Sequence, residues 1–185
     1  MVEDFDAWYG ELRPSMLAAL AAWCGDAGVA DEALDEAFVR AYERWDRVRS
    51  SPSPAGWVWR TATNVVRRHH RRRGLEERIL RRTDLRPDHT QPSSSEDDLD
   101  LRAAIQQLTE RQRTAVVLHH IADLPHAEVA AAMGVATGTV AATLHQARAR
   151  LAAELTVADD DAPAPAASAP PSTSSARRSI DGAAP

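Results

Sequence analysis

Apolar residues recur at intervals of three and four along most of the chain, and this spacing constrains the fold more than any other feature. It places apolar side chains on one face of an α-helix, whereas a strand would alternate every second residue. No stretch shows the strand pattern, so the sequence predicts an all-α fold. The first run consists of Phe5, Trp8, Tyr9, Leu12, Met16, Leu17, Leu20 and Cys24, with Pro14 as a possible kink.

Two further runs of this kind follow before residue 74. Gly25, Asp26 and Gly28 separate the first run from the second, and a serine- and proline-rich loop at 50–54 precedes the third. Three amphipathic helices can close a small core, so residues 1–74 are predicted to form a three-helix domain. The second run is Ala30, Ala33, Leu34, Ala37, Phe38, Ala41, Tyr42 and Trp45, and the third is Val58, Thr61, Ala62 and Val65.

The rest of the chain divides into a linker, a second domain and a tail. Over 75–98, charged residues, Pro87, Pro92 and a run of serines replace the apolar pattern, which predicts a flexible linker. Apolar spacing resumes over 99–155 and predicts four short helices in a second, smaller domain. Residues 156–185 are rich in Asp, Ala, Pro and Ser, and they offer too few large apolar groups to offset the entropy of ordering. We expect this tail to be disordered.

A helix-turn-helix is predicted within the second domain. Small and apolar residues over 129–140 allow two helices to cross closely, and Gly134 lies at the tight turn between them. A plain αα-hairpin would show the same spacing. The second of these helices starts near Thr137 and hides Val140 and Leu144. The residues that then face outward, toward a DNA major groove, are Thr139, Ala142, Thr143, Gln146 and Arg150. Gln146 would contact an adenine edge, and phosphates would be held by Thr139, Thr143 and Arg150. Thr137, at the start of the helix, is a further candidate DNA contact. An ordinary solvated face is the alternative.

Positive charge is concentrated on the third predicted helix. All 22 basic residues are arginine, and ten of them lie between 60 and 86, although the net charge of the chain is -5. Helical spacing groups four residues opposite the apolar face, which predicts a DNA-facing stripe: Arg60, Asn64, Arg67 and Arg71, with Arg68 beside them. Trp57 and Trp59 flank the core face. Because aromatics among basic residues stack with unpaired bases, Trp59 is the preferred stacking platform, with core packing as the alternative.

Acidic residues dominate the second predicted helix, where Asp31, Asp35, Glu36 and Arg40 lie near one another. Stacking on an aromatic contributes about 1–3 kcal/mol per base, whereas extruding a paired base costs a few kcal/mol. The first domain therefore cannot hold opened DNA alone. The acidic face is a candidate docking surface for a larger protein assembly, and a merely solvated face is the alternative.

Several other functions find no support in the sequence. Cys24 is the single cysteine, and the histidines lack zinc-ligand spacing or a neighbouring nucleophile, so we expect no metal, no cofactor and no catalysis. No stretch approaches the roughly 20 apolar residues of a membrane-spanning helix. We therefore expect a cytoplasmic protein that binds neither a membrane nor a small-molecule substrate.

From Phe5 to Leu155 the chain resembles the extracytoplasmic-function (ECF, group IV) sigma factors of bacterial RNA polymerase. Residues 30–38 (ADEALDEAF), 55–64 (AGWVWRTATN) and the arginines that follow are similar to sigma region 2. Residues 108–113 (LTERQR), 128–130 (EVA), 138–140 (GTV) and 147–151 (ARARL) are similar to region 4. The chain departs from the family's usual pattern at Asp35, where glutamine is common, and at Arg68, where aspartate is common. In the recognition helix it has Ala141, Ala142 and Thr143 where basic or hydroxyl groups are usual, and Gln146 where arginine is usual.

The resemblance implies a non-catalytic initiation subunit whose partners are core RNA polymerase, promoter DNA and an anti-sigma factor. Region 2 would dock on the polymerase clamp through Asp31, Asp35 and Glu36, and would capture the opened minus-10 element. The loop from Val48 to Gly56 would take a flipped base, while Asn64 and Arg71 hold the strand. Region 4 would read the minus-35 element. A stand-alone helix-turn-helix regulator, with an N-terminal sensing or dimerisation domain, is the alternative.

Overall fold

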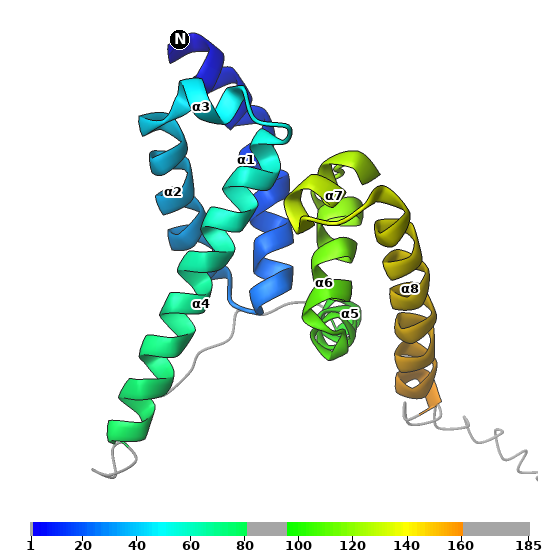
Figure 1. Cartoon of the computed structure of the whole chain (residues 1–185). Coiled ribbons are helices and arrows are strands. Elements are labelled where there is room, and N and C mark those ends of the chain that lie inside the picture. Colours follow the sequence, from blue (N-terminus) through cyan, green and yellow to red (C-terminus); the bar gives the residue numbers. More distant parts are fainter. Residues whose placement is uncertain (1, 81–95, 161–185) are drawn as a thin grey trace, which may run out of the picture.

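The computed structural model describes residues 2–80 and 96–160, and within these ranges it is all-α, as the apolar spacing predicts (Figure 1). Side-chain surroundings are described for 4–74 and 101–154. The elements in chain order are α1 (Val2–Cys24), α2 (Ala27–Glu43), α3 (Trp45–Arg49), α4 (Pro54–Leu80), α5 (Glu96–Gln107), α6 (Glu110–Val116), the π-helical turn η1 (Val117–Ile121), α7 (His126–Met133) and α8 (Thr137–Asp160).

The first domain consists of α1, α2 and α4, with the short α3 joining α2 to the loop before α4. Helix α1 continues through Pro14. Asp26 caps α2, because its Oδ1 accepts a hydrogen bond of 3.0 Å from the amide of Val29. The apolar faces of the three long helices meet in one core, and its fully buried side chains include Met16, Leu20, Leu34, Val58 and Val66. Burial of these large groups is the main force that holds the three helices together.

Two helices extend past the predicted domain boundaries. Helix α4 runs to Leu80 rather than ending at 74, and α8 runs to Asp160 rather than 155. Helical structure therefore enters both ends of the predicted linker, because α5 already begins at Glu96. The central part of that linker, 81–95, and the tail from 161 lie outside the described residues. Flexibility of the linker and disorder of the tail stay predictions.

The second domain contains the predicted helix-turn-helix. Helix α6 begins with a capping box, in which Thr109 and Gln112 each bond the backbone of the other. Helix α7 ends at Gly134, whose φ of +67° is a left-handed conformation that glycine adopts without a Cβ clash. Helix α8 then starts at Thr137, where the sequence places it. The core beneath these helices includes Leu118, Val129, Val140 and Leu144.

The two domains pack against each other. Helix α1 contacts α5 and η1, and α4 contacts α7. Figure 1 shows α1 between the helices of its own domain and those of the second, with α8 farthest from α4. Buried apolar residues of both domains join in one continuous cluster. The sequence predicts two domains but not this interface, which is formed by residues far apart along the chain.

Candidate nucleic-acid interface

The predicted basic stripe lies on one side of α4. We call Arg60, Asn64, Arg67, Arg68 and Arg71 the arginine stripe, and all five side chains are exposed. Arg67 Nη1 donates to Asn64 Oδ1 over 3.0 Å, so the amide and the guanidinium are held together. Four guanidinium groups within three helical turns form a concentrated positive surface, which is suited to the phosphates of a nucleic-acid strand.

Trp59 does not belong to that exposed surface. The prediction that its ring is exposed as a stacking platform for bases is wrong in this structure. The Trp59 side chain is only 3% exposed, and its ring meets Trp23 edge-on with centroids 5.9 Å apart. The buried face of α4 also includes Thr63, whose hydroxyl donates to the Trp59 carbonyl. Because α4 packs on both α2 and the second domain, its buried face is wider than one domain alone requires. Trp57 is half-buried against the core.

Two acidic residues of α2 form ion pairs with Arg13, which the sequence analysis did not identify. Arg13 of α1 reaches Asp31 Oδ1 at 2.8 Å and Asp35 Oδ1 at 2.9 Å. The hydrogen bond that Arg13 donates to the Asp35 carboxylate is the main cause that raises the pKa of Arg13. Both carboxylates remain more than half exposed, so they can still meet a partner. Arg13 and the two aspartates meet only through the packing of α1 on α2, and no sequence motif signals the contact.

Glu36 connects the acidic face to the arginine stripe. Its Oε1 pairs with Arg40 on the next turn of α2 and with Arg68 of α4 at 3.5 Å. Arg68 also donates to the Asn64 carbonyl. The two surfaces that the sequence assigns to different partners therefore adjoin, and they share one carboxylate.

On α8, the structure exposes three of the predicted DNA-contacting residues, Thr137, Gln146 and Arg150. Thr139 is half-buried. Thr143 is 8% exposed, and its hydroxyl donates over 2.7 Å to the carbonyl of Thr139. The prediction that Thr143 faces outward is therefore wrong: the residue lies on the edge of the core face, and its hydroxyl is satisfied within the helix.

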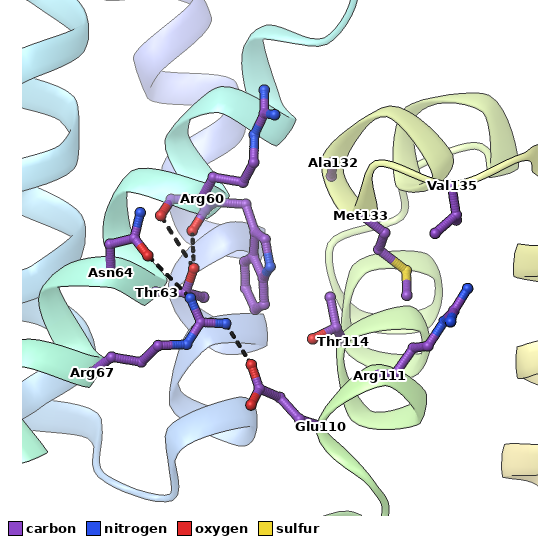
Figure 2. Close-up of a pocket in the computed structure, with 11 residues that line it drawn as sticks. Arg60, Thr63, Asn64, Arg67, Glu110, Arg111, Thr114, Ala132, Met133 and Val135 are labelled. Carbon is purple, nitrogen blue, oxygen red and sulfur yellow. Dashed lines mark hydrogen bonds and ion pairs between the residues drawn. The ribbon is translucent and has the colours of Figure 1, made fainter.

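A pocket of about 490 Å³ separates the arginine stripe from the second domain. Figure 2 shows Arg67 of α4 reaching toward Glu110 of α6, while Arg60 and Arg111 lie on opposite sides of the pocket. Met133 and Val135 form part of the opposite wall. The pocket thus has a basic wall from α4 and a partly apolar wall from the second domain.

Three histidines gather where η1 meets the start of α7. The His119 ring lies 4.7 Å from that of His120 and 4.5 Å from that of His126, measured between centroids. Burial, followed by the proximity of His119 and Arg148, lowers the pKa of His120. Within the described ranges no group of three or more His, Cys, Asp and Glu residues is arranged to hold a metal ion.

Within the described ranges, no single helix is long and apolar enough to cross a membrane, although α7 and α8, which are bent by 96° relative to each other, satisfy length and composition as a pair.

Comparison with known proteins identifies the family. The family described as Sigma-70 region 2 matches residues 8–76, and Sigma-70 region 4 matches 98–151. The RNA polymerase sigma-E factor of Streptomyces avermitilis is 33% identical over 164 residues, covering 87% of this chain and 90% of that protein. The ECF RNA polymerase sigma factor SigC of Mycobacterium tuberculosis is 30% identical, covering 72% of this chain and 74% of that protein.

Solved structures show the same fold. The sigma factor RpoE of Bartonella quintana, in complex with the anti-sigma factor NepR, matches with a TM-score of 0.66 and 22% identity, covering 84% of this chain and 98% of that one. CnrH in complex with the cytosolic domain of CnrY matches with a TM-score of 0.59 and 19% identity, covering 88% and 92%. The chain belongs to the ECF sigma factors of RNA polymerase. It directs promoter recognition and transcription initiation.

Proposed function

We propose that this protein is a group IV sigma factor that grips the opened minus-10 strand with the arginine stripe and docks on core polymerase through α2. The observation that carries the proposal is the exposed stripe on α4, adjoining an exposed acidic face on α2. A subunit that links an enzyme to melted DNA needs both surfaces. We further propose that it catalyses no reaction, needs no cofactor and acts in the cytoplasm, where the polymerase is.

The stripe supports strand binding through charge and geometry. Arg60, Asn64, Arg67 and Arg71 lie on successive turns of α4, and Asn64 adds an amide able to bond a base edge or a sugar. Each guanidinium that neutralises a phosphate releases condensed counterions, so binding should weaken steeply as salt rises. Trp59 would take part in base stacking only after it becomes uncovered.

The exposed face of α2 combines charged and apolar side chains, and this mixture supports its role in docking on polymerase. Asp31, Asp35, Val39 and Tyr42 follow one another at helical spacing on α2. Val39 is 59% and Tyr42 53% exposed, which is unusual for large apolar side chains on a small domain. Protein interfaces commonly combine an exposed apolar or aromatic centre with charged groups at the rim. Glu36 and Arg40 extend this face toward α4.

For the second domain we propose that α8 enters the major groove at the minus-35 element. Gln146 would read a base edge, and Thr137, Thr139 and Arg150 would hold the backbone. We also propose an anti-sigma partner, because the solved relative from Bartonella quintana is bound to one.

The stripe is tested by salt dependence. Holoenzyme with Arg60, Arg67 and Arg71 replaced by alanine should bind promoter DNA more weakly than wild type. The slope of log affinity against log salt should fall by about 0.7–0.9 per lost phosphate contact. A matched control replaces three exposed arginines elsewhere, Arg44, Arg47 and Arg102, and removes the same charge. An unchanged slope in the stripe variant, or an equal change in the control, would remove the stripe from DNA binding.

Docking is tested by co-elution with core polymerase. The wild-type chain should elute with the core enzyme in gel filtration, and Asp31→Arg with Asp35→Arg should abolish this while the fold persists. A stand-alone helix-turn-helix regulator would instead bind its DNA site without polymerase. A chain that never co-elutes with core polymerase would refute the docking role of α2.

A further inference from the structure

The pocket between the arginine stripe and the second domain has the size of a small-molecule site. Its volume of about 490 Å³ lies within the range of about 300–1,000 Å³ that is typical of ligand-binding cavities. One wall belongs to α4, and the other consists of α6 together with the end of α7 and the turn that follows it (Figure 2). A ligand in this space would contact both walls at once.

The walls of this pocket carry an excess of positive charge. Arg60 and Arg67 lie on the α4 wall and Arg111 lies on the α6 wall, whereas Glu110 is the single acidic residue among the described residues of the lining. Glu110 is already paired with Arg67. Within the part of the chain whose side chains are described, neither Arg60 nor Arg111 has an ion-pair partner. Two guanidinium groups from opposite walls are therefore available to an anion, and the planar fork of arginine is suited to phosphate oxygens.

The rest of the lining offers an apolar surface and a free amide. Met133 and Val135 are half-buried, and they lie on the same side of the pocket as Arg111 (Figure 2). The thioether of a methionine packs favourably against a planar aromatic ring. Asn64 uses its Oδ1 to accept a hydrogen bond from Arg67, which leaves the N–H groups of its amide free to donate. The pocket thus combines anion-binding groups, an apolar contact surface and hydrogen-bond donors.

We propose that this pocket binds a free nucleoside diphosphate. The phosphates lie between Arg60 and Arg111, the base packs against Met133, and the Asn64 amide donates to an oxygen of the sugar or the base. The ligand's charge is opposite in sign to the excess charge of the walls. A small inorganic anion would leave the apolar surface unused, and a nucleoside without phosphates would leave both guanidinium groups without a partner. A nucleotide uses all three features of the lining.

Nucleotide binding goes beyond the proposed function and does not depend on it. Arg60 and Asn64 nevertheless belong to both the pocket and the arginine stripe, so a bound nucleotide occupies two of the groups that the stripe offers to a DNA strand. This competition, unlike the binding itself, rests on the proposed function. Because the ligand contacts α4 and α6 together, it also stabilises the folded chain by mass action, and Tm rises with its concentration.

Isothermal titration calorimetry of the full chain at low salt tests the assignment. The four common ribonucleoside diphosphates are titrated first, followed by the four matching nucleosides and by pyrophosphate. At least one diphosphate should bind with a Kd of about 100 μM or tighter, and its nucleoside and pyrophosphate should each bind about tenfold more weakly or worse. Failure of all four diphosphates to bind, or pyrophosphate that binds as tightly as the nucleotide, would overturn the proposal.

Two exposed arginines of the second domain provide a variant and its matched control. Arg111→Ala removes one of the two available guanidinium groups and should weaken nucleotide binding by about tenfold, because charge-assisted hydrogen bonds are lost. Arg102→Ala removes the same charge from α5, outside the pocket, and should bind as wild type does. Both side chains are exposed, so Tm without ligand should match wild type in both variants. Equal nucleotide affinities in the two variants would contradict the site.

Nuclear magnetic resonance locates the ligand in the wild-type chain, without relying on the fold of a variant. The chain has three methionines, so selective isotope labelling of their methyl groups gives three signals, and Met133→Leu identifies that of Met133. Met16 is fully buried in the core of the first domain and serves as the internal reference. A base packed against Met133 should shift its methyl signal through the ring current, whereas pyrophosphate should not. A nucleotide that binds in calorimetry but leaves the Met133 signal unmoved would lie elsewhere, and the assignment would fail.

A strand-binding explanation of the pocket is tested in the same titrations. A short single-stranded DNA of random sequence might bind more tightly than every nucleotide and lose the same factor in Arg111→Ala. That result would make the pocket part of the strand-binding surface and would overturn the assignment to a free nucleotide. The role of the stripe is measured separately, by the salt dependence of holoenzyme. An unchanged salt slope there, together with nucleotide binding by the free chain, would refute the proposed role of the stripe alone.

Discussion

Arg113 makes four side-chain hydrogen bonds, three within the second domain and one to the first, and replacing it should measurably destabilise the protein. Its guanidinium donates to four backbone carbonyls: Ile105 at 3.2 Å, Gln106 at 2.6 Å, Leu108 at 3.2 Å and Trp23 at 3.1 Å. Three of these groups lie at the end of α5 and its following turn, and the fourth ends α1. One side chain thus satisfies carbonyls at two helix ends.

The magnitude follows from these contacts and from what opposes them. A hydrogen bond to a charged group contributes about 1.5–3 kcal/mol, and a buried carbonyl left without a partner costs about 1–3 kcal/mol. Burial lowers the pKa of Arg113, which shows that part of the gain is offset by desolvation of the cation. We therefore expect Arg113→Met, which keeps the apolar stem, to lower the free energy of unfolding by about 2–4 kcal/mol.

Urea and thermal denaturation followed by far-UV circular dichroism measure this loss. For a chain of this size, 2–4 kcal/mol corresponds to a fall in Tm of roughly 5–15 °C. Arg113→Lys keeps the charge without the planar fork, so it should fall between wild type and Arg113→Met. The neighbouring, exposed Arg111→Met serves as the control and should change stability by less than about 0.5 kcal/mol. Equal stability of Arg113→Met and Arg111→Met would refute the reasoning.

Two further predictions concern the second domain. Gly134→Val should destabilise it by about 1–2 kcal/mol because a β-branched residue strains the φ of +67°, whereas Gly134→Asn should cost less; thermal denaturation would show equal Tm values if the turn were unstrained. Burial lowers the pKa of His120, so the folded state favours the neutral ring. As the pH falls below the ordinary histidine pKa of about 6.5, the unfolded chain takes up the proton more readily than the folded one, and the protein should lose stability. Urea titrations at about pH 7.5 and about pH 5.5 should show this loss, and His120→Gln should reduce it; an identical pH dependence in both proteins would exclude His120 as its source.

The sequence predicts well what depends on neighbours along the chain. Helix faces, the all-α fold, the turn at Gly134 and the start of α8 follow from local spacing and from the conformational freedom of glycine. The exposed arginines of α4 follow from the same spacing. These features are fixed within one or two helical turns, so a pattern in the sequence is sufficient to find them.

Features that depend on contacts between distant elements were missed. Trp59 is buried with its ring against Trp23 of α1, and the pairing of Arg13 with Asp31 depends on how α1 lies on α2. Thr143 was missed for a different, local reason. Its hydroxyl bonds the Thr139 carbonyl within α8, and the buried face of this helix is wider than its large apolar residues alone indicate. A small residue or a threonine at the edge of a helix face carries little signal about which side is buried.

The Glu36 carboxylate has ion-pair partners on both α2 and α4. A mutation of Glu36 therefore disturbs two surfaces at once. Glu36→Ala would remove a group from the surface assigned to polymerase and would also free Arg68 on the surface assigned to DNA. Lost transcription in such a mutant could not be attributed to either contact alone. Asp31 and Asp35, which form ion pairs with Arg13 of α1, are the cleaner positions for genetic dissection, and a screen of this protein should begin with them.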